Sequence, residues 1–212
     1  MTVKLRHVIK REGDLLSLFP TFLPKPFAKS TGAGFCVEFE IKGEGLQVER
    51  FLAGLALHAP ECVVFTNSIA NSYPRLGSRE CEDYVSVGES GGLVKIKRER
   101  DRLLAKMDFP DSSGNVFLLF SALITAGVLG VREELRPVDE IDDLTPSVIK
   151  DLVRLPTSLD KALQISEGSG FLKEVLGEGL GNTFVVEKKK EIEEISSRAT
   201  EEEFLSYYGD IL

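Results

Sequence analysis

Cys36, Glu38 and Glu40 are the residues whose types and spacing first suggest chemistry. They alternate with apolar residues along Phe35–Ile41, so a half-buried strand would place all three on one face. A thiol beside carboxylates could hold a soft metal ion. A strand face that meets solvent or a partner explains the same pattern, and we favour that interpretation. The chain has only two histidines, which disfavours a histidine-rich metal site or a histidine base.

The overall charge restricts the partners of the chain. With 212 residues and a net charge of −8, the sequence predicts about one large domain that binds neither nucleic acid nor a membrane. Cys36, Cys62 and Cys81 are too few and too widely spaced for a disulfide scaffold, and Cys62 in an apolar run is expected in the core. The odd cysteine count and the lack of a signal peptide favour a cytoplasmic location.

A strand that ends at Pro110 and the apolar helix after it form the predicted centre of the fold. Pro110 has no N–H to donate, so the preceding strand should stop near Phe109. Asp111 to Ser113 offers oxygens for a turn or a helix N-cap. From Asn115 to Val131 the chain is apolar nearly all round, which predicts a buried core helix. That length is short for a membrane span, which needs about 20 residues.

Strands precede this helix and helices follow it, which is an α+β pattern. A strand meander is expected from Glu82–Val87, Gly92–Lys97 and Arg102–Phe109, with a turn at Gly88–Gly92. Other helices are expected at Val3–Arg11 (ended by Gly13), Leu46–His58, Phe171–Leu176 (closed by Gly177) and Thr183–Ser197. Further helices are expected to begin at N-caps at Thr145 and Thr157 and at a capping box at Thr200–Glu203.

A series of short motifs runs along the chain: Thr21–Pro26, Gly32–Gly34, Phe51–Leu55 with His58–Pro60, Phe65–Asn67, Asn71–Leu76, Phe109–Asp111 with Asn115, Leu155–Leu159, Leu176–Gly177 and Thr200–Tyr208. In this order and spacing they resemble the second half of the glutamine synthetase catalytic domain, over essentially the whole chain. The resemblance implies an antiparallel sheet with packed helices, as part of a glutamine synthetase/guanido kinase-like catalytic domain. Residues 1–212 would then form one truncated domain, with a strand-rich core in residues 1–131 and a helical part in residues 132–212.

The sequence departs from the family pattern where the metal chemistry of that family lies. Glutamine synthetases activate glutamate with ATP, and the divalent metals they need are held by carboxylates and a histidine. Cys36 stands at the family's first histidine position, and a thiol is a poor ligand for magnesium. Lys106 stands where a metal carboxylate is expected, and Asp108 where a phosphate-facing arginine is expected. Cys81 holds the place of a flap glutamate. We therefore predict no metal, no catalytic residue and no cofactor, with Lys106 paired to Asp108 or Glu38 in the emptied site.

Three positions keep the residue type or the charge of the family. Gly32 matches the loop glycine beside the substrate, Arg75 the arginine that grips the substrate carboxylate, and Lys95 an arginine that contacts phosphate. The resemblance thus implies vestigial substrate binding at Gly32 and Arg75 and vestigial phosphate binding at Lys95. An exposed loop arginine and a solvated strand lysine are the alternative interpretations of Arg75 and Lys95.

Our first hypothesis is a glutamine-synthetase-like protein without independent ligase activity, which serves as a binding, interaction or regulatory module in nitrogen metabolism. Half of a catalytic domain should leave an open strand edge and an uncovered apolar face. We therefore expect a homo-oligomer, or a complex with a glutamine synthetase chain or with a separately encoded first half.

Two alternatives remain open, so whether the chain is an enzyme is not decided by its sequence. It could be one part of a split ATP-dependent glutamate–ammonia ligase, with ATP and magnesium as cofactors and a partner chain supplying the missing carboxylates. Cys36 and Lys106 argue against this, because we expect both at buried strand positions that a partner could not reach. It could also be a sensor that holds glutamate or a similar carboxylate through Arg75.

Overall fold

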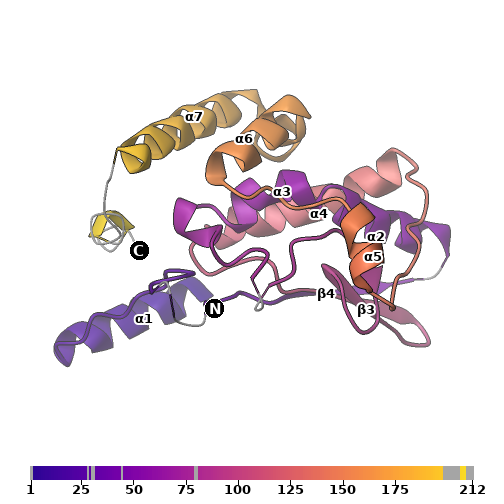
Figure 1. Cartoon of the computed structure of the whole chain (residues 1–212), viewed down its shortest axis with the longest axis horizontal. Coiled ribbons are helices and arrows are strands. Elements are labelled where there is room, and N and C mark those ends of the chain that lie inside the picture. The colour runs from indigo at the N-terminus through magenta and orange to yellow at the C-terminus, as the bar shows by residue number, and fades with distance from the viewer. Residues whose placement is uncertain are drawn as a thin grey trace.

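The fold combines a small sheet with helices, which confirms the predicted α+β class (Figure 1). The computed structural model describes residues 2–27, 29, 32–43, 45–78, 81–197 and 206–208. Its elements are α1 (Thr2–Leu15), β1 (Val37–Lys42), α2 (Leu46–Leu57), α3 (Ala59–Thr66), a 3₁₀ turn (Ala70–Ser72), β2 (Val87–Gly88), β3 (Val94–Arg98), β4 (Arg102–Met107), α4 (Val116–Arg132), α5 (Pro146–Asp151), α6 (Leu159–Gly168) and α7 (Phe171–Ser196).

The four strands form one sheet in the order β1-β4-β3-β2. β4 is antiparallel to both of its neighbours, and the register sets Lys106 beside Glu38 on one side and Lys95 on the other. Alternation along the strands buries Val37 and Met107 in the core and leaves the charged residues on the opposite face. The alternation predicted for residues 35–41 is therefore confirmed, and the exposed face of the sheet is polar.

The predicted strand meander is wrong at its first strand. β2 has only two residues, and it lies parallel to β3 instead of antiparallel. The backbone before β2 is engaged elsewhere: Val85 N–H donates to the Val153 carbonyl, and Leu155 N–H donates to the Asp83 carbonyl. Because these groups are satisfied by a segment far along the chain, residues 83–85 do not join the sheet.

Helices α2 and α4 pack against each other at the centre of the molecule. Asn115 caps α4, with its side-chain oxygen accepting from the Phe117 N–H at 2.9 Å. The two helices approach closely enough that a Cβ on Gly54 would lie 2.9 Å from the Gly130 Cα. A Cβ on Gly130 would likewise lie 2.7 Å from the Gly54 Cα. The helices therefore meet backbone to backbone at this pair of glycines.

The prediction that α4 is buried all round is wrong. Leu119, Ala122 and Leu123 are buried on one side, but four apolar side chains on the other side are 37–72% exposed. We call these four residues the α4 stripe: Phe117, Phe120, Ile124 and Val128. Their spacing of three and four residues places them on one line along the helix. The apolar composition of α4 thus includes a face that no described part of this chain covers.

Several predicted helix ends shift. Gly13 does not end α1, which runs to Leu15; a Cβ on Gly13 would lie 2.6 Å from the Pro20 Cδ, so the glycine permits close packing of the returning chain. Ser158, not Thr157, caps α6 by accepting from the Lys161 N–H. Gly177 breaks the helical geometry inside α7, as the sequence predicted for that position.

The capping box predicted at residues 200–203 lies outside the described residues, although residues 206–208 are helical. In the described part of the chain, none of the helices combines the length and apolar character needed to cross a bilayer. Helices α6 and α7 form a layer over α3, whereas α1 lies apart from them on the other side of the molecule (Figure 1).

Candidate functional site

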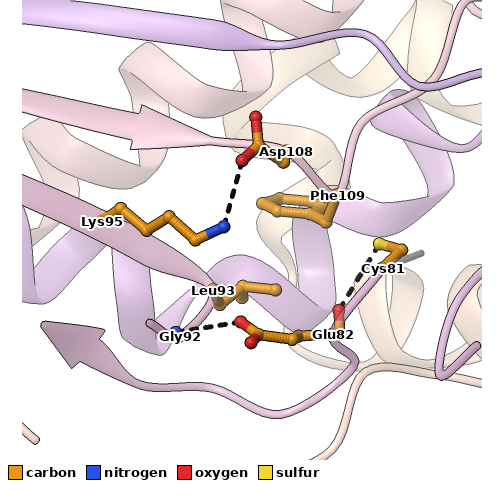
Figure 2. A pocket seen from close by; sticks show the side chains of 7 residues that line it. All are labelled: Cys81, Glu82, Gly92, Leu93, Lys95, Asp108 and Phe109. Atoms are coloured by element: carbon orange, nitrogen blue, oxygen red, sulfur yellow. Dashed lines mark hydrogen bonds and ion pairs between the residues drawn. The ribbon is translucent and has the colours of Figure 1, made fainter. Parts of the chain in front are cut away.

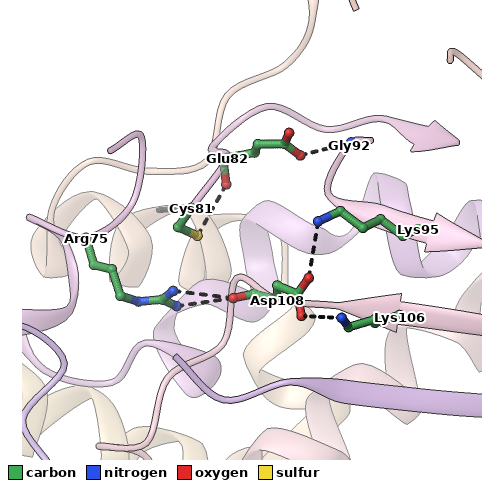
Figure 3. Close-up of polar contacts among 7 residues, drawn as sticks. All are labelled: Arg75, Cys81, Glu82, Gly92, Lys95, Lys106 and Asp108. Carbon is green, nitrogen blue, oxygen red and sulfur yellow. Dashed lines mark hydrogen bonds and ion pairs between the residues drawn. The ribbon is translucent and has the colours of Figure 1, made fainter. Parts of the chain in front are cut away.

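The site at the end of β4 is built around the carboxylate of Asp108, as Figure 3 shows. Lys95 on β3 places its Nζ atom 3.2 Å from one carboxylate oxygen. Lys106 on β4 places its Nζ atom 3.5 Å from the other oxygen. The predicted pairing of Lys106 with Asp108 is confirmed, and within the described residues Lys106 forms no ion pair with Glu38. Two lysines thus converge on one carboxylate.

The ionisation of Asp108 and Cys36 follows from this arrangement. Burial alone would raise the pKa of Asp108, but hydrogen bonds from Lys95 and Cys36 and the charges of both lysines outweigh it and lower the pKa. Burial and the hydrogen bond to Asp108 raise the pKa of Cys36. The carboxylate is therefore held ionised and the thiol protonated, and a protonated thiol is a poor metal ligand.

A cavity of about 270 Å³ opens beside this carboxylate (Figure 2). Inside it, the Glu82 carboxylate accepts a hydrogen bond from the Gly92 N–H at 2.9 Å. Burial raises the pKa of the Cys81 thiol at the cavity wall, so that group is also protonated. The cavity is smaller than the roughly 300–1,000 Å³ of most small-molecule pockets. Its lining residues are Cys81, Glu82, Gly92, Leu93, Lys95, Asp108 and Phe109.

Arg75 is buried, with only 3% of its surface exposed, and it contacts the backbone at the end of β4. Its Nη1 donates to the Asp108 carbonyl at 3.3 Å, and its Nη2 donates to the carbonyls of Phe109 and Pro110. Both terminal nitrogens therefore clamp the turn that follows the strand. The interpretation of Arg75 as an exposed loop residue is wrong; its role in binding a substrate carboxylate stays a prediction.

The Gly32 loop lies beside this clamp. Gly32 itself is half-buried, and Gly34 forms an isolated bridge with Asp111. A Cβ on Gly34 would lie 3.1 Å from the Arg75 Nη1, so the loop backbone passes directly over the guanidinium. The structure thus places Gly34 of this loop beside Arg75, and substrate binding at Gly32 and Arg75 stays a prediction.

The buried carboxylate of Asp111 supports the turn that follows β4. Asp111 is 1% exposed and accepts hydrogen bonds from the Asn67 side chain at 3.1 Å and from the Ser113 N–H at 2.8 Å. Burial raises the pKa of Asp111 in spite of these hydrogen bonds. Asn67 also donates to the Phe109 carbonyl, so this network holds α3 against the end of β4.

The residues present do not fit a divalent metal. Two ammonium groups stand at the Asp108 carboxylate, and no group of three or more His, Cys, Asp or Glu side chains in the described residues is arranged to hold a metal ion. The expectation that Cys36 and Lys106 lie at buried strand positions is wrong. Cys36 and Lys106 are exposed and not buried, because no described residues form a layer over the strand face that carries them. A partner could therefore reach these positions.

Sequence reasoning missed part of the site. Phe109 and Leu93 line the cavity through their apolar side chains, and Glu82 closes it by binding the Gly92 amide. No local pattern marks these residues, because the fold joins them only by pairing β3 with β4 and folding residues 81–92 over that pair. His58 lies at a helix end as predicted, with its ring stacked on Phe171.

Comparisons with known proteins agree with the fold and with one family. The sequence model of one protein family, the glutamine synthetase catalytic domain, matches residues 1–207 of this chain. The glutamine synthetase of Mycolicibacterium smegmatis is 27% identical over 96% of this chain and 48% of its own length, and that of Pyrococcus horikoshii is 29% identical over 91% and 48%. The chain thus spans about half the length of the curated relatives it matches.

Solved structures show the same relation at the level of the fold. A structure of GmaS in complex with ADP has a TM-score of 0.79 at 23% identity, and this chain covers 52% of it. A glutamine synthase homologue has a TM-score of 0.80 at 18% identity, with 53% of it covered. Both likenesses extend over nearly the whole of this chain, at 95% and 99%.

Proposed function

The chain belongs to the glutamine synthetase family through its catalytic domain, and from that premise we propose that it has no ligase activity of its own and serves as a binding or regulatory module in nitrogen metabolism. One observation carries this proposal: Lys95 and Lys106 both contact the Asp108 carboxylate where the family's reaction needs metal and phosphate. An ammonium group repels a divalent cation, and an ionised carboxylate repels a phosphoryl group.

The protonated thiols of Cys36 and Cys81 add to this argument, because neither supplies a negative ligand at neutral pH. We accordingly propose that the chain binds no catalytic metal and needs no cofactor. The three cysteines are free thiols, which suits the reducing cytoplasm in which we place the protein.

The test is an assay of ATP hydrolysis and of γ-glutamyl transfer by the purified chain with glutamate, ammonia or hydroxylamine, and magnesium or manganese. We expect neither activity above a no-protein blank. The control is a full-length glutamine synthetase, such as that of Pyrococcus horikoshii, in the same buffer. Turnover by the chain alone would refute the proposal.

A split ligase is the second candidate, and the exposure of Cys36 and Lys106 favours it more than the sequence did. In this case a partner chain would place its own carboxylates over the open face of β1 and β4, with ATP and magnesium bound between the chains. Activity that arises only when the partner is added would support this candidate.

A carboxylate sensor is the third candidate, and the carbonyl contacts of Arg75 weigh against it. A ligand carboxylate would have to displace backbone carbonyls that already satisfy both terminal nitrogens of the guanidinium. Isothermal titration with glutamate tests this candidate. Heat of binding at millimolar glutamate would support it, and a variant with Lys95→Ala would show whether the cavity takes part.

A further inference from the structure

We propose that the outer faces of α1 and α4 form a docking surface for a polypeptide that supplies the other half of the glutamine synthetase catalytic fold. This inference rests on the proposed function, because it names the partner of that module. It goes further by placing the contact on particular side chains away from the cavity at Asp108.

Helix α1 meets the rest of the chain with its polar side. Arg6 donates to the Gly114 carbonyl at 3.5 Å and stacks over the Phe22 ring, and Gly13 is buried against Pro20. The apolar residues Leu5, Val8 and Ile9, which we call the α1 stripe, lie on a neighbouring side of the helix and are 38–56% exposed. The contacts of Arg6 and Gly13 therefore leave these apolar side chains uncovered by the described residues. Apolar side chains that gather on an exposed helix face are typical of a surface that contacts a partner.

The α4 stripe repeats this arrangement on the central helix. Phe117 is the most exposed of its four residues, at the end of α4 that adjoins the Arg6 contact with Gly114. Figure 1 shows α1 apart from the layer of α6 and α7. The two stripes together place seven exposed apolar side chains on two helices.

The free edge of β1 carries acidic side chains that a partner strand has to match. Among the described residues, no strand pairs with the outer edge of β1, and its exposed face carries Glu38 and Glu40. If two copies paired symmetrically through this edge, one register would set Glu38 opposite Glu40, and the other would set Glu40 opposite itself with Glu38 opposite Lys42. Like charges directly opposite each other on antiparallel strands are destabilising. A partner with neutral or basic side chains on its strand avoids this repulsion.

The size of the related folds identifies the kind of partner. Two solved structures share the fold of this chain over 95–99% of its length. The chain covers only 52–53% of those structures. The remainder of that fold is therefore about as large as this chain, which is large enough to reach both stripes and the β1 edge. We infer an apolar contact with the two stripes and a strand beside Glu38 and Glu40.

The experiment co-expresses the tagged full chain with the part of a glutamine synthetase that precedes the matched region, taken from Pyrococcus horikoshii and, separately, from Thermotoga maritima. Co-purified protein is analysed by size-exclusion chromatography with light scattering, without nucleotide or glutamate. We expect an equimolar complex with at least one of the two halves.

Variants then locate the contact. Phe117→Glu with Ile124→Glu alters the α4 stripe, and Leu5→Glu with Val8→Glu alters the α1 stripe. Leu180→Glu on α7 is the matched control, because Leu180 is also an exposed leucine on a helix but lies outside both stripes. We expect each stripe variant to weaken association by about tenfold or more and the control to leave it unchanged. Melting temperatures of the isolated variants show that they fold, since the replaced side chains are exposed.

Three results would overturn the inference: failure of both halves to co-purify, stripe variants that bind as well as the control, or self-association of the chain alone that the stripe variants abolish. The last result would make a second copy the occupant. None of these results concerns ligase activity, which the assay of the isolated chain tests separately.

Discussion

Replacing Asp108 with asparagine should destabilise the protein by about 1 kcal/mol at neutral pH, since exposed ion pairs contribute about 0.2–1 kcal/mol each. The register sets Lys95 and Lys106 directly opposite each other on β3 and β4, so removal of the carboxylate charge leaves two ammonium groups side by side. The three side chains are 36–46% exposed, which is why we take a value for surface pairs and not for buried ones. For a domain of this size the change corresponds to a fall in melting temperature of about 2–4 °C.

The same argument fixes the pH dependence. The pKa of Asp108 is lower in the folded chain than in the unfolded chain, so its contribution to stability is present above the unfolded pKa and is lost as pH falls through the folded pKa. The stability difference between the wild type and Asp108→Asn should therefore be constant from about pH 7 to pH 5 and shrink at lower pH.

The measurement is urea unfolding of both proteins, followed by circular dichroism at a series of pH values. Asp139→Asn is the matched control, because Asp139 is an exposed loop carboxylate with no ion pair among the described residues. An Asp108→Asn variant as stable as the wild type at neutral pH would refute the idea that this carboxylate compensates two lysines. So would a stability difference that grows as the solution becomes more acidic.

Three further predictions concern the scaffold. Gly54→Ala should cost about 1–3 kcal/mol in urea unfolding, because its methyl group would overlap the backbone of α4, whereas Gly168→Ala, which meets open space, should be nearly neutral in the same measurement. Arg75→Lys should cost about 2–3 kcal/mol in chemical unfolding, because an ammonium cannot reach the three carbonyls that the guanidinium contacts; an unchanged midpoint would contradict this. Tyr208→Phe removes a hydrogen bond to Glu191 and one from a backbone amide, and should lower stability by about 1–2 kcal/mol. Hydrogen exchange at that amide should quicken, and unchanged exchange would show that the tyrosine hydroxyl does not anchor the chain end.

Local patterns predicted much of the fold. The alternation in residues 35–41 and the apolar run capped by Asn115 are properties of neighbouring residues, so β1 and α4 were found from the sequence. The first strand of the meander was not, because the backbone at Asp83 and Val85 pairs with residues 153–155, far along the chain. The exposure of the α4 stripe was missed for a related reason: composition shows that a face is apolar but not whether another segment covers it.

The candidate site divides in the same way. The reversed charges relative to the family pattern predicted that Lys106 pairs with Asp108 or Glu38, and the structure shows the pair with Asp108. The burial of Arg75 could not be predicted, because its carbonyl partners become available only when the chain turns after β4. The exposure of Cys36 and Lys106 was wrongly predicted, since strand alternation fixes which residues share a face and leaves open what lies over that face.

The contact between Gly54 and Gly130 imposes a constraint on how this protein can diverge. Side chains around the cavity touch water, and there an acid and an amine can exchange places while the chain still folds. Where the two helix backbones touch, any side chain larger than the hydrogen atom of glycine would force them apart. Descendants of this protein should therefore alter their pocket charges many times before either glycine changes.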